Sequence, residues 1–173
     1  MKTEEHTEII RQATAEDIVS IFSIWKAGQA SAMGDTTFDI KMTEEEVKKT
    51  FLYNILHQTA TFKVWVYEKE NSIIAWCSIL PFHPNPLLKD TWGIISMYIH
   101  PDYQNHIYGY LFSSQVLKAA SESSLKYIIS VVAADNERIK RLSVKMSFVT
   151  LGILPKNEAD NPLAVSEIMI FEA

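Results

Sequence analysis

The chain has 173 residues, of which 47% are hydrophobic and 21% charged, and its formal net charge is −5. This length and apolar content suit one globular domain with a buried core, and they exclude disordered and collagen-like chains. The negative charge argues against a nucleic-acid-binding protein, because such proteins need basic surface to neutralise phosphates.

The first third of the sequence predicts a strand followed by two amphipathic helices. Ile9 and Ile10 suit a short strand, and Thr14 begins a helix through a near capping box with the acidic residues behind it. Residues 28–34 are expected to form a loop, since two glycines bracket small residues there. A second capping box at Thr43 begins another helix. The apolar residues that define the two helical faces are Ile18, Ile21, Phe22, Trp25, Val47, Phe51 and Ile55.

From residue 62 onward the apolar pattern alternates with a period of two, which is typical of strands. A polar turn, Glu68 to Ser72, joins the first two strands. Pro81, Pro84 and Pro86 then place a loop before the third strand, because proline lacks a backbone donor. The strands are expected at 62–67, 73–80, 93–99, 127–134, 148–154 and 164–171, with helices at 111–119 and 139–146.

This order of elements predicts an α/β fold, a mixed β-sheet flanked by helices, in a single domain over residues 1–173. Helices that follow strands bring their N-termini to one edge of the sheet. An anionic cofactor would bind at that edge, because helix N-termini present unpaired N–H groups.

The cysteine content and the apolar runs bear on the compartment. Cys77 is the single cysteine and lies in the apolar run from Ile73 to Leu80, so an intramolecular disulfide is excluded and a buried structural thiol is favoured. The first eight residues are polar, and no apolar run is long enough to span a bilayer. We therefore expect a cytoplasmic protein without a membrane partner.

Two sequence blocks carry a resemblance to a known family. Residues 99–109 read I-H-P-D-Y-Q-N-H-I-Y-G, and Pro101, Gln104 and Gly109 match the motif V-x-P-x-x-R/Q-x-x-G-x-G/A. Residues 136–148 resemble N-x-x-x-x-R-L-Y/H-E-K-L-G-F, with matches at Asn136, Arg141, Leu142, Lys145 and Phe148. Both motifs are typical of the GCN5-related N-acetyltransferase superfamily. Nearly the whole chain resembles it, and the strand that ends at Ile99 is most similar to the phosphinothricin and methionine-sulfone acetyltransferase branch.

The resemblance implies acetyl-CoA as the cofactor and assigns residues to it. The backbones of Met97, Tyr98 and Ile99 would pair with the pantetheine arm like an added strand. Asn136 would contact the cofactor with its side chain, and it is an equally good helix N-cap; both roles are compatible. The turn amides that would surround the pyrophosphate belong to Gln104, Asn105, His106, Ile107, Tyr108, Gly109 and Tyr110.

Ile107 stands where the family motif has its first glycine. A β-branched residue is strained at positive φ, so two outcomes are open. Either the turn keeps negative φ with the isoleucine side chain turned away, or the affinity for the cofactor is reduced.

The catalytic positions of the family are also changed in this chain. Attack on a thioester needs a neutral amine, whereas alkyl amines with a pKa of about 10.4 are mostly protonated at neutral pH. The family glutamate that takes this proton matches Ile94, and its Tyr or His acid matches Ser143. We take Ser143 and Tyr98 as the candidate catalytic residues, although Tyr98 alternates with its neighbours and could simply be packed. The other titratable residues near the expected cleft are His83, Asp90 and His100, for which surface or capping roles are favoured.

The expected function is N-acetyl transfer from acetyl-CoA to the primary amine of a small molecule, with a homodimer through residues 81–88. An amino-acid-like substrate is less favoured, since Lys89 replaces the arginines that grip a carboxylate in the resembling branch. The alternatives are a catalytically weakened acyl-CoA-responsive or protein-binding module of the same fold, and a plain interaction domain without a cofactor. No metal-ligand spacing is found.

Overall fold

The computed structural model describes residues 8–30, 42–83, 85–88, 90–104, 107–134, 136–154 and 166–173. Four α-helices are present in these ranges: α1 (Ile18–Ala30), α2 (Glu44–Leu56), α3 (Tyr108–Ser121) and α4 (Glu137–Lys145). The strands are β1 (Glu8–Gln12), β2 (Lys63–Lys69), β3 (Ser72–Pro81), β4 (Trp92–Ile99), β5 (Tyr127–Ala133), β6 (Val149–Leu154) and β7 (Ser166–Glu172). Short 3₁₀ helices cover Ala15–Asp17, Pro86–Leu88 and Pro101–Tyr103.

The seven strands form one sheet in the order β1-β2-β3-β4-β5-β7-β6. Every neighbouring pair is antiparallel except β4 and β5, which run parallel. The sheet is therefore mixed, as the sequence predicts. It places the single parallel pair in the middle of the molecule.

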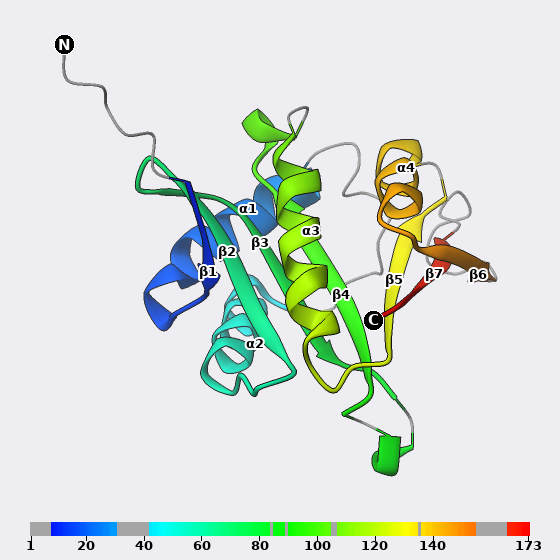
Figure 1. The fold of residues 1–173 in the computed structure, drawn as a ribbon. Coiled ribbons are helices and arrows are strands. Elements are labelled where there is room, and N and C mark those ends of the chain that lie inside the picture. The colour runs from blue at the N-terminus through cyan, green and yellow to red at the C-terminus, as the bar shows by residue number, and fades with distance from the viewer. Residues whose placement is uncertain are drawn as a thin grey trace.

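Helices cover both faces of the sheet, with α3 on one face and α1 and α2 on the other (Figure 1). The α3 face buries Phe112 and Val116 against the odd-numbered residues of β4 and β3, among them Met97 and Cys77. The opposite face packs Ile21 and other apolar residues of α1 and α2 against Trp76. Two cores result, because successive strand residues point to opposite faces.

The capping boxes predicted at the starts of the first two helices are present. The backbone N–H of Thr43 donates to Glu46 Oε2 at 2.7 Å, and the N–H of Thr14 donates to Asp17 Oδ2 at 2.8 Å. Asp17 also receives two hydrogen bonds from the Arg11 guanidinium, at 2.7 and 2.8 Å. The hydrogen bond from Arg11 is the largest cause of the lowered pKa of Asp17. This contact ties β1 to the start of α1.

The structure corrects the predicted boundaries in two places. The turn between β2 and β3 is shorter than the predicted Glu68–Ser72, because Glu70 and Asn71 both adopt positive φ, at 50° and 61°, and close a two-residue hairpin. Helix α1 continues to Ala30, so residues 28–30 of the predicted 28–34 loop are helical, and the rest of that loop lies outside the described residues. The last strand begins at Ser166, and its predicted start at Ala164 also lies outside them.

Two further expectations concern burial. Cys77 is fully buried, and burial raises the pKa of its thiol, which confirms the expected buried thiol. Within the described part of the chain, no helix combines the length and apolarity needed to cross a bilayer.

The Arg11–Asp17 pair leads to a prediction about stability. The Asp17→Asn variant should lose about 1–3 kcal/mol of unfolding free energy at pH 7, because Arg11 loses its ionised partner. The folded-state pKa of Asp17 is lowered, so its contribution is complete above the unfolded pKa of about 3.9 and disappears as the pH falls through the folded value. Urea unfolding at pH 7 and pH 3 should show the gap between the two proteins narrowing at pH 3. An equal gap at both pH values would contradict this assignment.

Candidate active site

The parallel pair β4–β5 separates soon after it begins. The two strands are in register only from Trp92 opposite Tyr127 to Ile94 opposite Ile129. Beyond this point β4 stays paired with β3 as far as Ile99, and β5 stays paired with β7. The remaining parts of β4 and β5 therefore diverge and leave a gap in the sheet.

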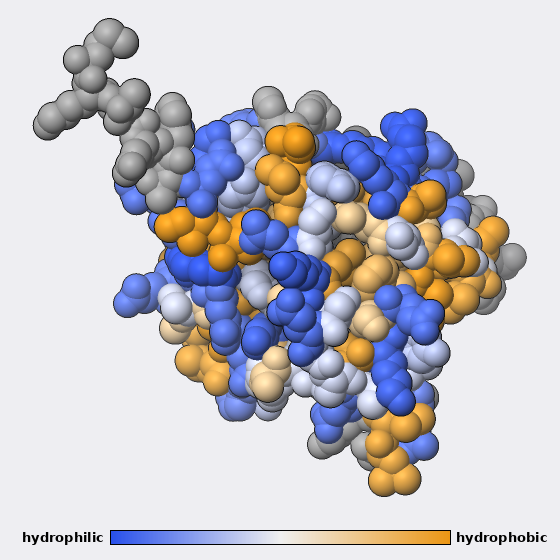
Figure 2. Space-filling view, in the orientation of Figure 1, coloured by the Kyte–Doolittle hydropathy of each residue, from blue (hydrophilic) through white to orange (hydrophobic). Residues whose placement is uncertain are grey.

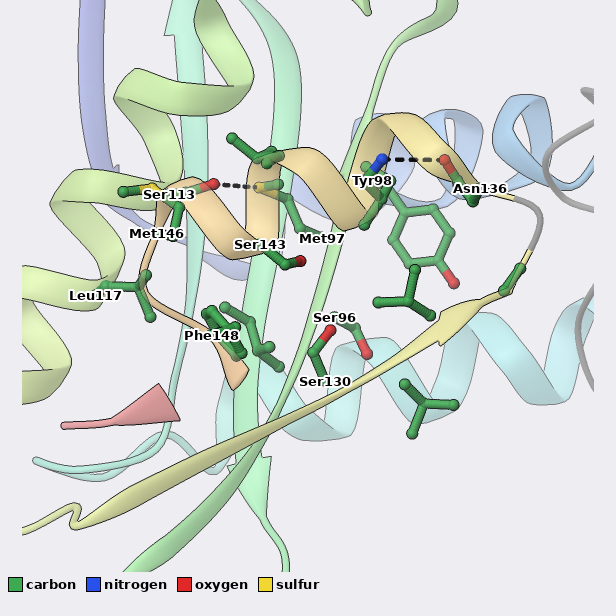
Figure 3. A pocket seen from close by; sticks show the side chains of 16 residues that line it. Ser96, Met97, Tyr98, Ser113, Leu117, Ser130, Asn136, Ser143, Met146 and Phe148 are labelled. Carbon is green, nitrogen blue, oxygen red and sulfur yellow. Dashed lines mark hydrogen bonds between the residues drawn. The ribbon is translucent and has the colours of Figure 1, made fainter. Parts of the chain in front are cut away.

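A cavity of about 210 Å³ occupies this gap. Its walls come from β4, β5, α3 and α4, and Figure 3 shows side chains of all four elements directed toward it. Ser96, Ser130 and Ser143 bring hydroxyl groups from three different elements to the cavity, whereas Leu142 and Met146 give it apolar walls. Among the described lining residues Tyr98 is the only one with an ionisable side chain.

The register of β4 against β3 decides which backbone groups face the gap. Trp92 O accepts from Phe82 N, and His100 N donates to Ile74 O, so the even-numbered residues of β4 pair with β3. In an antiparallel ladder the intervening residues point their N–H and C=O groups the other way. Met97 therefore directs its N–H and C=O groups into the gap, where no described strand pairs with them, whereas the N–H of Ile95 is used by the last parallel pair, Ile94 opposite Ile129.

The three residues that the sequence assigned to a backbone contact do not all turn their backbone groups toward the gap. Met97 faces the gap with its backbone, but Tyr98 lies opposite Trp76 and turns its N–H and C=O toward β3. The carbonyl of Ile99 accepts a hydrogen bond from the Gln104 side chain at 3.1 Å. A backbone contact to a ligand is thus available at Met97 and at the carbonyl of Ile95, a residue that motif matching does not single out.

The start of α3 lies at the end of this gap. Ile107 is its N-cap, with φ −64° and ψ −13°, and its side chain is 63% exposed. Of the two outcomes open from the sequence, the structure has the first: φ is negative and the isoleucine points outward. The N–H groups of the first helical turn, Tyr108 to Tyr110, have no partner within the helix. Asn105 and His106 lie outside the described residues.

Gly109 is a helical residue that allows close packing. A Cβ atom built on it would lie 3.1 Å from Ile99 Cδ1 and 3.6 Å from Leu142 Cδ2. No described glycine has positive φ, so the matched glycine of the motif serves the approach of α3 to β4 and α4 rather than a special turn. It sets where the first turn of α3 lies.

Side chains on either side of Gly109 hold the helix start in place. The Tyr108 hydroxyl accepts a hydrogen bond from Lys69 Nζ, which also pairs with Glu8 at 3.1 Å, and these contacts raise the pKa of Lys69. Tyr110 packs under Lys145, whose Nζ lies 4.2 Å from the ring centroid. Both tyrosines therefore act as anchors of α3 through their side chains.

The α4 residues singled out from the sequence reach the same cavity. Asn136 caps α4 by accepting from Ile139 N at 3.1 Å, and it also lines the cavity, so both roles stay compatible. Ser143 lies about two helical turns after Asn136. It is 8% exposed and lines the same cavity. Lys140, by contrast, is held by Glu137 and Glu167, at 2.7 and 3.2 Å.

The other titratable candidates do not line this cavity. His83 packs against Trp92, and His100 accepts from Asp102 N at the end of β4, where the sequence favoured a strand-end surface residue. Asp90 is exposed, and Lys89 lies outside the described residues.

Tyr98 also lines a second cavity, of about 200 Å³, on the opposite face of the sheet under α1 and α2. Its ring stacks on Trp76, with centroids 4.9 Å apart. The Tyr98 side chain is therefore packed, which is the alternative that the sequence left open. Ser96 lines both cavities as well. These two residues of β4 are shared by the walls of the two cavities.

Comparisons with known proteins agree with this geometry. The family model for the acetyltransferase (GNAT) domain matches residues 9–149. A candidate phosphinothricin N-acetyltransferase superposes with a TM-score of 0.82 at 22% identity, covering 96% of this chain and 98% of that one. A ribosomal-protein-alanine N-acetyltransferase from Brucella melitensis gives 0.79 at 19% identity, with 95% and 99% covered.

A third solved structure contains a ligand. The phosphinothricin acetyltransferase from Sinorhizobium meliloti, in complex with acetyl-CoA, gives a TM-score of 0.77 at 17% identity, with 96% of this chain and 88% of that one covered. No curated protein matches the sequence significantly. At these identities the solved structures establish the likeness of the fold.

The packing of Gly109 leads to a second prediction. Gly109→Ala should destabilise the protein by about 1–3 kcal/mol, because the added methyl overpacks the contact with Ile99. Gly152→Ala is the matched control, since a Cβ there meets no atom within 4 Å. Thermal unfolding of the two variants compares them directly. Equal melting temperatures for both would show that α3 does not need this close approach.

Proposed function

The chain belongs to the GNAT acetyltransferase family, and we propose that it transfers the acetyl group of acetyl-CoA to the primary amine of a small molecule. The observation that carries the proposal is the gap between β4 and β5, which presents unpaired backbone groups of β4 beside the N-terminus of α3. An elongated ligand with amide groups and a diphosphate needs this combination of contacts.

The fit of acetyl-CoA can be judged from the residues of this chain. The carbonyl of Ile95 and both backbone groups of Met97 suit the amides of a pantetheine arm, which would add to β4 like a strand. The start of α3 suits a diphosphate, because a helix N-terminus favours negative charge. The exposed side chain of Ile107 leaves that approach open.

Acetyl-CoA supplies an acetyl thioester. The cavity between β4 and β5 would hold it next to Ser96 and Tyr98, where an amine arriving from the second cavity meets it. The new N–C bond forms as the C–S bond breaks, the electron pair goes to sulfur, and the amine proton passes to water. Much of the acceleration would then come from holding the two reactants together.

Two groups of the chain are placed to stabilise charge during this reaction. The Ser143 hydroxyl would donate a hydrogen bond to the departing sulfur, and a β4 backbone N–H would donate to the carbonyl oxygen as negative charge develops there. Tyr98 would position the amine, because its ring forms the wall between the cavities.

The alternative function is an acyl-CoA-responsive module with weakened catalysis. One observation favours it: no carboxylate, histidine or lysine is found among the described residues that line either cavity. Calorimetry with acetyl-CoA followed by a thiol-release assay over a panel of amines separates the two. Binding with amine-dependent thiol release supports the enzyme, binding without it supports the module, and absence of binding rejects both.

A homodimer through residues 81–88 stays a prediction. The described part of this segment exposes apolar side chains, and Leu87 is 88% exposed. Figure 2 shows apolar surface at the tip of this loop and again at the edge of the sheet formed by β6. Both surfaces have the composition that a contact between subunits requires.

The neutral lining predicts how the rate depends on pH. If no side chain takes the amine proton, only the neutral amine reacts, so kcat/KM should rise about tenfold per pH unit up to the amine pKa of about 10.4. Steady-state rates from pH 6 to 9 with one amine measure this slope. A plateau that begins near pH 7 would reveal an enzymic base and contradict the proposed mechanism.

Substitution of Ser143 tests its role separately from binding. Ser143→Ala should lower kcat about 10- to 100-fold, because a hydrogen bond to a charged group contributes about 1.5–3 kcal/mol. The Kd for acetyl-CoA should stay nearly unchanged, since the hydroxyl acts on the departing sulfur. Ser143→Thr keeps the hydroxyl and should retain most of the activity. Equal activity of the Ala and Thr variants would remove Ser143 from the mechanism.

A further inference from the structure

The second cavity lies between the sheet and the layer of α1 and α2, and four aromatic rings line it. Trp25 of α1 meets Phe51 of α2 edge-on at 5.8 Å, and Phe51 meets Trp76 of β3 at 5.1 Å. Trp76 in turn stacks on Tyr98 of β4 at 4.9 Å. We call these four residues the aromatic row. The cavity is therefore lined by rings from four different elements.

Ser78 places a hydroxyl group on the sheet side of this cavity. It follows Trp76 by two residues on β3, so both side chains point to the same face of the sheet. Ser78 is 5% exposed and lines the cavity, as does Val64, its neighbour on β2. A buried hydroxyl thus stands among apolar side chains, where it needs a hydrogen-bond partner.

The Ser78 hydroxyl has no such partner among the described residues. By contrast, Ser113, which is equally buried, donates to Gly109 O at 2.6 Å. Among the described residues that are not exposed, the Trp76 indole nitrogen is the only side-chain nitrogen or oxygen that lacks both a partner and accessible surface. The unpaired Ser78 oxygen is therefore accessible, and the space that reaches it is the cavity that it lines.

Ser96 adds a second hydroxyl at the same place. It lies directly opposite Ser78 in the ladder between β3 and β4, and it lines the cavity too. Residues opposite each other on one face have Cβ atoms about 4.5–5.5 Å apart, so one ligand group can reach both side chains. A ligand hydroxyl suits this pair, because it donates to one serine and accepts from the other.

The size of the cavity limits the rest of the ligand. An apolar cavity of about 150 Å³ is enough to bind benzene, and this one measures about 200 Å³. One ring with one or two small substituents therefore fits. Contacts between aromatic rings contribute more than their buried area alone, so an aromatic ligand gains more from the aromatic row than a saturated ring of the same size.

We infer that the second cavity is a binding site for a phenol: its single aromatic ring contacts the aromatic row, and its hydroxyl group pairs with Ser78 and Ser96. The inference concerns binding by the chain itself, in the absence of a cofactor. It holds whether or not the ligand is the acceptor of the proposed acetyl transfer.

Three probes of similar size test the inference by NMR titration of the full chain without coenzyme A. p-Cresol has the aromatic ring and the hydroxyl, p-xylene replaces the hydroxyl by a methyl group, and 4-methylcyclohexanol replaces the aromatic ring by a saturated one. p-Cresol should bind about fivefold more tightly than 4-methylcyclohexanol, because only its ring is aromatic. Its binding should shift the amide signals of Ser78 and Trp76.

Variants of the two serines test the hydroxyl contact. Ser78→Ala should raise the Kd for p-cresol about fivefold and leave the Kd for p-xylene nearly unchanged, because only p-cresol loses a partner. Ser96→Ala should have the same selective effect. Ser78→Thr keeps the hydroxyl and should retain the affinity for p-cresol. Ser72→Ala is the matched control, since it lies on the same strand outside the cavity, and it should change neither Kd.

The outcomes separate this inference from the proposed function. Absence of saturable p-cresol binding, or shifts confined to other parts of the chain, overturns the site. Equal affinities for p-cresol and 4-methylcyclohexanol overturn the aromatic requirement, and serine-to-alanine variants that affect p-cresol and p-xylene alike overturn the hydroxyl contact. No titration contains a cofactor, so failure of acetyl-CoA binding or thiol release rejects the proposed function and leaves this site standing.

Discussion

The short parallel pairing of β4 with β5 is the constraint on which the rest of the site depends. Only three residue pairs are in register, from Trp92 opposite Tyr127 to Ile94 opposite Ile129, and both strands then follow their antiparallel neighbours. The divergence exposes β4 backbone groups that a continuous sheet would pair. It also opens the sheet, so Ser96 and Tyr98 line the cavity in the gap as well as the cavity under α1 and α2.

The two faces of the sheet divide the work that the proposed reaction requires. The α3 face supplies a helix N-terminus whose position is set by the close packing of Gly109 on Ile99, which suits a phosphorylated ligand. The α1 and α2 face supplies a cavity lined by the rings of Trp25, Phe51, Trp76 and Tyr98. Since neither described lining contains a charged side chain, positioning and backbone donors carry the proposed chemistry. This accounts physically for a site in which Ile94 and Ser143 occupy the positions of a base and an acid.

The sequence was sufficient for the fold because local signals agreed with one another. The capping boxes at Thr14 and Thr43 and the alternation along the strands gave the elements, and two spaced motifs gave the family. The site was only partly accessible. The backbone direction of Met97 and Tyr98 depends on the register of β4 against β3, which is a tertiary property. The negative φ of Ile107 and the approach of the aromatic rings from four separate elements, α1, α2, β3 and β4, likewise follow from packing that the sequence pattern does not encode.

Amide hydrogen exchange on β4, with and without coenzyme A, tests the central claim most directly. Coenzyme A should slow exchange at the Met97 amide, which faces the gap, and should leave the Ser96 and Tyr98 amides, already paired with β3, nearly unchanged. Unaltered exchange at Met97 under saturating coenzyme A would contradict the account, because the ligand would then bind without using the opening between β4 and β5.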